Sequence, residues 1–195
     1  SYIYDQFDGE LQSSFIMEVK PVGTTGLEKV WEWYLSDHFV QDRRPDLPNY
    51  VNDVTEWPHM IDANLPAGHS LDSDWSHTNT IHYNPYLDAV IESSREIGYN
   101  GGGEQYVIKR EHPYGGKIIW RCCNPDNYGG SVDNFPVGRR TLSSRQHGAN
   151  WIPPNWKYGN DIIFLSNTYH DPTNVQGKAA MVRLTNIPYY YSCQN

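Results

Sequence analysis

The sequence predicts an α+β fold, with two helices in the first half of the chain and an antiparallel β-sheet in the second half. Two helical patterns before residue 100 and four β-type segments after it support this class. Long loops rich in aromatic residues separate the elements. A chain of 195 residues is long enough for one hydrophobic core, so we predict a single domain over residues 1–195, with a helical and irregular half (1–100) and a β-rich half (101–195).

The first elements are predicted to be a strand pair within residues 2–20, because apolar and polar side chains alternate there. A helix is predicted next, over about residues 26–39. Thr25 and Glu28 have the spacing of a capping box, and apolar side chains follow at helical intervals.

A second helix is predicted between Asn84 and Gly98. Asn84 is a favourable N-cap, Pro85 suits the first helical position, and glycine commonly ends a helix. Segments rich in good β-formers follow, and they predict strands at 104–111, 117–123, 161–166 and 178–186, the first two as a hairpin.

Residues 41–83 and 124–160 show no sustained hydrophobic period and are predicted to be irregular. Long structureless segments in a domain are often binding surfaces, so we expect function in the first of them.

The composition excludes several classes of protein. The formal net charge of −8 argues against a general nucleic-acid binder, which needs clustered cations. No apolar run approaches the roughly 18 residues of a membrane helix, and no secretory signal pattern opens the chain. An aromatic content of 14% argues against disorder.

The three cysteines leave two alternatives. Either Cys122 or Cys123 could form a disulfide with Cys193, which would leave the other thiol free. Alternatively, all three could be buried reduced thiols, since free cysteine packs well in protein cores.

Asp8-Gly9 followed by Glu18-Val19-Lys20 resembles the PD-(D/E)xK nuclease superfamily. The resemblance implies that Asp8 and Glu18 would hold Mg²⁺ through their oxygen atoms, while Lys20 would stabilise charge or position the attacking water. The motif covers about 35 residues. The other interpretation of the same residues is a surface hairpin with an exposed Glu–Lys face.

Histidines and carboxylates suggest a second candidate site, for a divalent metal. His69, His77 and His82 lie near Asp62, Asp72 and Asp74, and His170-Asp171 stands at a predicted strand end. The five-residue offset between His77 and His82 places them on neither one helical face nor one strand face. Ordinary loop histidines are the alternative.

Aromatic residues in the predicted loops suggest a third candidate, a recognition surface. Their rings could stack on sugar rings or bind a protein, or they could hold the loops to the core. The candidate ligand-binding residues are Trp57, Trp75, Tyr114, Tyr128, Trp151, Trp156 and Tyr158.

These features favour a non-enzymatic recognition or assembly protein at an extracellular or virion surface, without a cofactor. Its expected partner is a glycan or a protein surface, and it could form a homo-oligomer. The alternative function is the divalent-metal nuclease, with Mg²⁺ as cofactor. A glycan-cleaving enzyme is a third possibility, for which the sequence assigns no residues.

Overall fold

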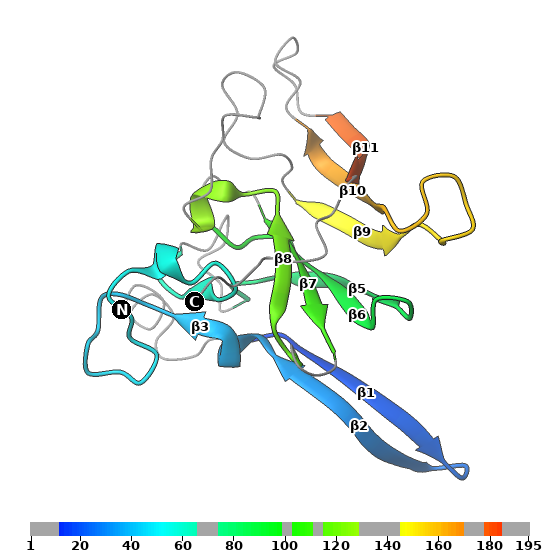
Figure 1. Cartoon of the computed structure of the whole chain (residues 1–195), viewed down its shortest axis with the longest axis horizontal. Helices are drawn as coiled ribbons and strands as arrows, with labels where there is room; N and C mark the ends of the chain where they lie inside the picture. Colours follow the sequence, from blue (N-terminus) through cyan, green and yellow to red (C-terminus); the bar gives the residue numbers. More distant parts are fainter. Residues whose placement is uncertain are drawn as a thin grey trace.

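The computed structural model describes residues 12–65, 74–98, 103–110, 115–128, 145–169 and 178–184. In this part of the chain the only helices are short 3₁₀ turns, namely η1 (Leu35–His38), η2 (Val54–Glu56) and η4 (Pro125–Tyr128). The predicted α+β class is therefore wrong, because the described residues form several small, mostly antiparallel β-sheets (Figure 1). None of the described helices has the length and apolarity needed to cross a membrane.

The largest sheet is an antiparallel meander at the centre of Figure 1. Its strands, in spatial order, are β5 (Thr78–Asn84), β6 (Ala89–Ser94), β7 (Glu104–Lys109) and β8 (Ile118–Cys122). The pairing of β7 with β8 confirms the hairpin predicted at 104–111 and 117–123.

A second antiparallel sheet contains β9 (Gln146–Trp151), β10 (Ile162–Tyr169) and β11 (Lys178–Leu184), with β10 in the middle. Its last two strands confirm those predicted at 161–166 and 178–186. The first strand was not predicted, because it falls in the segment 124–160 that lacks a hydrophobic period.

Two smaller pairs precede these sheets. β1 (Phe15–Val22) and β2 (Gly26–Tyr34) form a long antiparallel hairpin that projects from the body at the lower right of Figure 1. β3 (Phe39–Val40) and β4 (Ile61–Asp62) form a short parallel pair. The strand pair predicted within residues 2–20 is not tested in full, because residues 1–11 lie outside the described part; β1 itself pairs with β2.

The helix predicted over residues 26–39 is wrong, because this segment forms β2, η1 and β3. Thr25 lies in the hairpin turn that joins β1 to β2, where Gly23 has a φ of 61° and Val22 faces Gly26. The capping-box spacing was therefore coincidental. Valine, tryptophan and tyrosine within β2 are strong β-formers, and this propensity agrees with the observed strand.

The helix predicted between Asn84 and Gly98 is also wrong. Asn84 does cap a backbone turn, because its Oδ1 accepts hydrogen bonds from the backbone N–H groups of Tyr86 (3.0 Å) and Leu87 (3.2 Å). That turn connects β5 to β6 rather than starting a helix. Every residue of β6 is buried, as expected for a strand covered on both faces.

A separate hydrophobic core covers each face of the β5–β8 sheet. The first core joins the sheet to the N-terminal segments and contains Trp33, Leu35, Ile61, Trp75, Val90, Tyr106, Ile108 and Ile118 among others. The second joins it to the β9–β11 sheet and includes Ile91, Val107, Trp120, Ala149, Trp151, Ile162 and Phe164.

Candidate functional site

The candidate site lies where β5 meets β9. The two strands are not joined by a backbone ladder but by bonds between side chains and backbone. Asn79 Nδ2 donates to the carbonyl of Gln146 (2.7 Å), and the backbone N–H of Gly148 donates to Thr80 Oγ1 (2.9 Å). This contact brings the start of β5 beside the start of β9, although about 70 residues separate them in sequence.

His77 stands immediately before β5 and is held by Asp74. The His77 Nδ1 atom lies 2.7 Å from Asp74 Oδ2, and the His77 backbone N–H donates to Asp74 Oδ1 (3.2 Å). A carboxylate at Nδ1 favours the tautomer with its proton on Nδ1, so Nε2 carries the free lone pair. His77 also has a φ of 45°, a conformation that costs energy and is often found at functional sites.

Arg95 follows β6 directly and lies beside His77. Its backbone N–H donates to the His77 carbonyl (3.3 Å), and its Nη1 lies 2.5 Å from Glu96 Oε1. The Arg95 Nε atom is buried and has no hydrogen-bond partner among the described residues. A buried donor without a partner costs about 1–3 kcal/mol, so the position is suited to an acceptor that arrives from outside the chain.

His147 is the second residue of β9 and lies in the electrostatic field of the other two groups. Burial lowers the pKa of His147 below its usual value of 6.5, and the charge of Arg95 and that of His77 in its protonated form lower that pKa further. His147 is therefore neutral at physiological pH, and one of its ring nitrogens has a lone pair available for bonding.

Glu92 lies beneath these residues, inside the β5–β8 sheet. Its Oε1 accepts hydrogen bonds from Thr78 Oγ1 and from Ser94 Oγ (2.9 Å), while its Oε2 has no partner in the described part of the chain. Burial raises the pKa of Glu92 to about 7, with a further contribution from the charge of Glu104. Because Thr78 follows His77 and Ser94 precedes Arg95, Glu92 ties together the two strand ends that carry the site.

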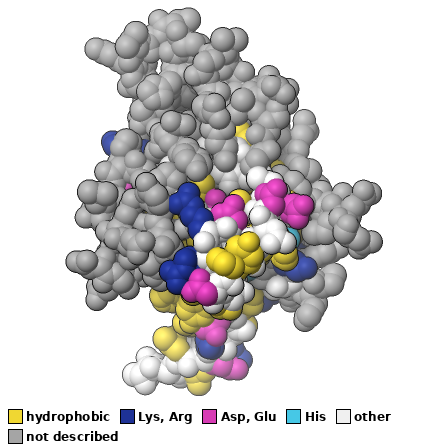
Figure 2. All heavy atoms as spheres, turned by 90° about the vertical axis from the view of Figure 1, so that its left-hand side faces the viewer, with side chains coloured by type: hydrophobic (Ala, Val, Ile, Leu, Met, Phe, Trp, Pro, Cys, Tyr) yellow, Lys and Arg dark blue, Asp and Glu magenta, His cyan; other side chains and the backbone are white. Residues whose placement is uncertain are grey.

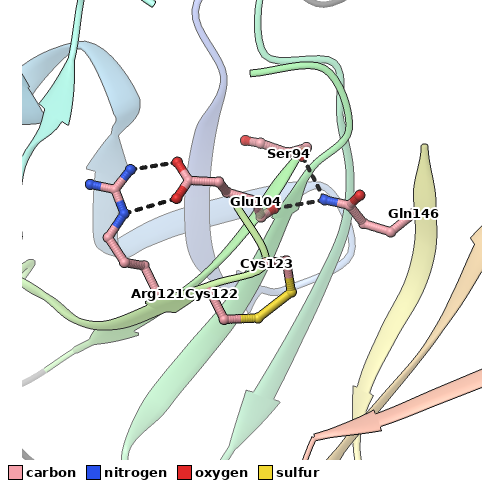
Figure 3. The surroundings of a disulfide bond; sticks show 6 residues. All are labelled: Ser94, Glu104, Arg121, Cys122, Cys123 and Gln146. Atoms are coloured by element: carbon pink, nitrogen blue, oxygen red, sulfur yellow. Dashed lines mark hydrogen bonds and ion pairs between the residues drawn. A yellow bond between two sulfur atoms is a disulfide. The ribbon is translucent and has the colours of Figure 1, made fainter. Parts of the chain in front are cut away.

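A buried ion pair joins β7 to β8 in the same sheet. Arg121 and Glu104 form a two-point ion pair, and Arg121 also donates to the carbonyl of Met60 (2.6 Å). Figure 3 shows this pair and the amide of Gln146, which donates to the carbonyls of Ser94 (2.8 Å) and Glu104 (3.0 Å). Both β9 and the loop before β4 are thereby attached to the same end of the sheet, where β6 ends and β7 begins.

The cysteine next to Arg121 forms an unexpected bond. Cys122 and Cys123, consecutive in sequence, are joined by a disulfide (Figure 3). The sequence suggested either a bond to Cys193 or three free thiols. The structure overturns both alternatives for Cys122 and Cys123, while Cys193 lies outside the described residues.

The described residues of the nuclease resemblance do not form the expected metal site. Glu18 and Lys20 are exposed on β1, where Glu18 pairs with Arg110 (3.1 Å) and Lys20 pairs with Glu28 (3.7 Å). Asp8 lies outside the described residues. In the described part of the chain, no group of three His, Cys, Asp or Glu side chains could hold a metal ion.

Of the histidine candidates, the structure describes only His77 and His82. His82 lies within β5, where its Nδ1 accepts a hydrogen bond from the backbone N–H of Trp151 (2.9 Å). His77 belongs to the candidate site described above. His69, Asp72 and His170-Asp171 lie outside the described residues.

The predicted aromatic ligand-binding residues divide into two groups. Trp75 and Trp151 are buried in the cores, and Tyr128 is half-buried with its ring under Arg121, so these three rings help to hold the fold together. The exposed rings are those of Trp57, Trp156 and Tyr158. Tyr114 lies outside the described residues.

Sequence reasoning singled out His77, but only as a metal ligand, and it missed Arg95, His147 and Glu92. No local pattern marks these residues, because the contact between β5 and β9 alone brings them together.

The family model described as Arylsulfotransferase (ASST) matches residues 4–182. Comparisons with curated proteins and with solved structures give no match.

Proposed function

The chain belongs to the arylsulfotransferase family, and we propose that it transfers a sulfuryl group from an aryl sulfate to an aromatic alcohol at the site formed by His77, Arg95 and His147. The observation that carries this proposal is the buried Nε donor of Arg95, which has no partner among the described residues and belongs to a guanidinium whose charge acts on His147. A sulfonate presents several oxygen acceptors, and the planar guanidinium of arginine binds such groups well.

His147 is the proposed nucleophile, because its lowered pKa leaves it neutral beside the positive charge of Arg95. In the first step a His147 nitrogen forms a bond to sulfur while the bond from sulfur to the aryl oxygen breaks. The departing phenolate takes a proton from protonated His77, and Arg95 stabilises the charge on the sulfonate oxygens.

In the second step the roles reverse. The acceptor phenol gives its proton to His77 Nε2, its oxygen forms a bond to sulfur, and the bond between sulfur and His147 breaks. Asp74 supports both steps, because its hydrogen bond fixes the His77 ring.

The test is an assay of the whole chain with p-nitrophenyl sulfate as donor and phenol as acceptor, in which absorbance measures the release of p-nitrophenol. We expect Arg95→Gln to lower kcat about 10²–10³-fold, as for loss of an oxyanion donor. His147→Asn should abolish transfer. His59→Asn is the control, since His59 lies outside the site and its substitution should leave the rate unchanged.

Two results would contradict the proposal. An inactive wild-type chain would reject the transferase function, and active Arg95→Gln and His147→Asn variants would reject this site. Protein exposed to donor alone and then denatured at alkaline pH should carry a sulfuryl group on His147, detectable by peptide mass spectrometry. The His77→Asn variant should retain that group when phenol is added, because it lacks the base.

The proposal extends to location. A disulfide such as Cys122–Cys123 persists in oxidising compartments. This supports an extracellular or other oxidising setting for the protein, in which its thiols are not kept reduced.

A further inference from the structure

The loop between β9 and β10, residues 152–161, is held in one shape by its own hydrogen bonds. The backbone N–H of Ile152 donates to the Asp161 carbonyl (2.8 Å), and that of Asn160 donates to the Ile152 carbonyl (2.9 Å). Within the loop, the N–H of Trp156 donates to the Pro153 carbonyl (2.9 Å). A side chain that projects from such a loop is already ordered, so a ligand need not supply the entropy cost of fixing it.

Two aromatic rings project from this loop. The Trp156 side chain is 67% exposed and that of Tyr158 is 49% exposed. Tyr158 has a φ of 68°, which is unfavourable for a bulky residue and is retained where the surroundings enforce it. The molecule therefore keeps large apolar faces in water at some energetic cost.

Two cations surround Tyr158. The guanidinium carbon of Arg183, on β11, lies 3.6 Å from the ring centroid, and Lys157 Nζ lies 4.9 Å from it. Arg183 Nη1 also pairs with Asp161 Oδ2 (2.9 Å), and the Arg183 side chain remains 35% exposed. The carboxylate and the ring fix the guanidinium in place while part of it still faces water.

We propose that Trp156, Lys157, Tyr158 and Arg183 form a binding platform for an acidic polysaccharide. The exposed Trp156 ring offers a flat face for the apolar C–H face of a sugar ring. The Tyr158 ring holds the two cations beside it, and these offer donors for sulfate or carboxylate groups. Neutral sugars would make the first contact but not the second, so the platform should discriminate by charge.

The platform is separate from the candidate site and does not rest on the proposed function. His147 lies near the start of β9, while the loop begins after Trp151 at its other end. Four residues of a strand span about 13 Å. One sugar unit therefore cannot contact both places, and loss of the platform should leave the reaction on a small aryl sulfate unchanged.

The experiment measures binding of the whole chain by isothermal titration calorimetry. The probes are a heparin oligosaccharide, its chemically desulfated form, an oligosaccharide of polygalacturonate, and neutral dextran as the uncharged control. We expect the chain to bind heparin, polygalacturonate or both, and to bind the desulfated form at least about tenfold more weakly than heparin if sulfate is the group recognised. Comparison of heparin with polygalacturonate identifies whether sulfate or carboxylate is preferred.

Variants test whether the named residues carry the binding. Trp156→Ala and Arg183→Gln should each weaken binding about tenfold or more, as for anchor residues of an interface. Trp57→Ala is the matched control, because Trp57 is also exposed but lies on another loop, and it should bind as the wild type does. Circular dichroism and thermal unfolding verify that each variant is folded.

The proposal is overturned if neither acidic probe binds, if neutral dextran binds as well as the acidic probes, or if folded Trp156→Ala and Arg183→Gln retain wild-type affinity. Because binding is measured without an aryl sulfate, a failed transferase assay does not affect this outcome, and a failed binding experiment does not affect the transferase proposal.

Discussion

The β1–β2 hairpin and the β5–β8 sheet are both antiparallel, yet their side chains have opposite surroundings. Most hairpin side chains are exposed, among them those of Phe15 (57%), Val22 (50%) and Leu27 (70%). In Figure 2 hydrophobic and charged side chains share the surface of the projecting lower part of the molecule. By contrast, all of β6 and most of β7 are buried.

The ion pairs of the two regions differ in the same way. Lys29 and Glu32 lie 2.7 Å apart on the exposed hairpin, where water screens their interaction. Arg121 and Glu104 are almost fully buried in the sheet. The comparison teaches that the stability of this protein depends on the sheet, because a two-stranded hairpin in water is at best marginally stable by itself.

The largest expected effect comes from breaking the buried pair. Arg121→Met should lower the free energy of unfolding by about 3–5 kcal/mol, because it leaves the Glu104 carboxylate buried and uncompensated. Chemical denaturation measures this loss. The matched hairpin variant Lys29→Met should change stability by at most about 1 kcal/mol.

A double variant sharpens this prediction. Adding Glu104→Gln to Arg121→Met should recover part of the loss, since the unpaired charge is gone. A double variant less stable than the single one would contradict the assignment of the loss to buried charge.

Truncation of apolar side chains should show the same contrast between the sheet and the hairpin, with a smaller loss of stability. Ile91 is fully buried on β6, so Ile91→Ala should cost about 2–5 kcal/mol. Leu27→Ala on the hairpin should stay within about 0.5 kcal/mol. Equal losses in urea unfolding would mean that the hairpin is covered in solution and that its exposure does not describe the folded protein.

Glu92 gives a prediction about pH. Its pKa is raised from 4.5 to about 7 in the folded protein, so the folded state binds this proton more tightly than the unfolded state does. The contribution of Glu92 to stability is therefore full below pH 4.5 and is lost as the pH rises to about 7. The loss amounts to about 3 kcal/mol across that window.

The Glu92→Gln variant checks this assignment, because its side chain does not titrate. Its free energy of unfolding, measured between pH 4.5 and 7, should fall less with rising pH than that of the wild type. Parallel pH profiles for the two proteins would show that another group carries the dependence.

The sequence allowed four strands of the second half to be predicted, but not β9 and not the strands that replace the two expected helices in the first half. The segments at 104–111 and 117–123 combine β-formers with a turn between them, and this local information was sufficient. Asn84 misled because its capping side chain serves the turn between β5 and β6, and Thr25 misled because its spacing to Glu28 was coincidental. A short apolar run such as Ala89-Val90-Ile91 fits a helix or a buried strand equally well.

The candidate site was harder to predict from the sequence than the strands were. His77 and Arg95 lie 18 positions apart, and His147 lies 52 positions beyond Arg95. Only the packing of two sheets brings them together, and that packing depends on the whole fold. The exposed rings of Trp156 and Tyr158 were identified from the sequence, but it gave no means to distinguish them from the buried rings of Trp75 and Trp151.

The bond between Cys122 and Cys123 has one further consequence. Crosslinks stabilise proteins chiefly by restricting the unfolded chain, and the gain depends on how much chain they enclose. This crosslink joins immediate neighbours and encloses no intervening residue. Reduction of this bond should therefore remove little restriction from the unfolded chain and leave the surrounding strands in place.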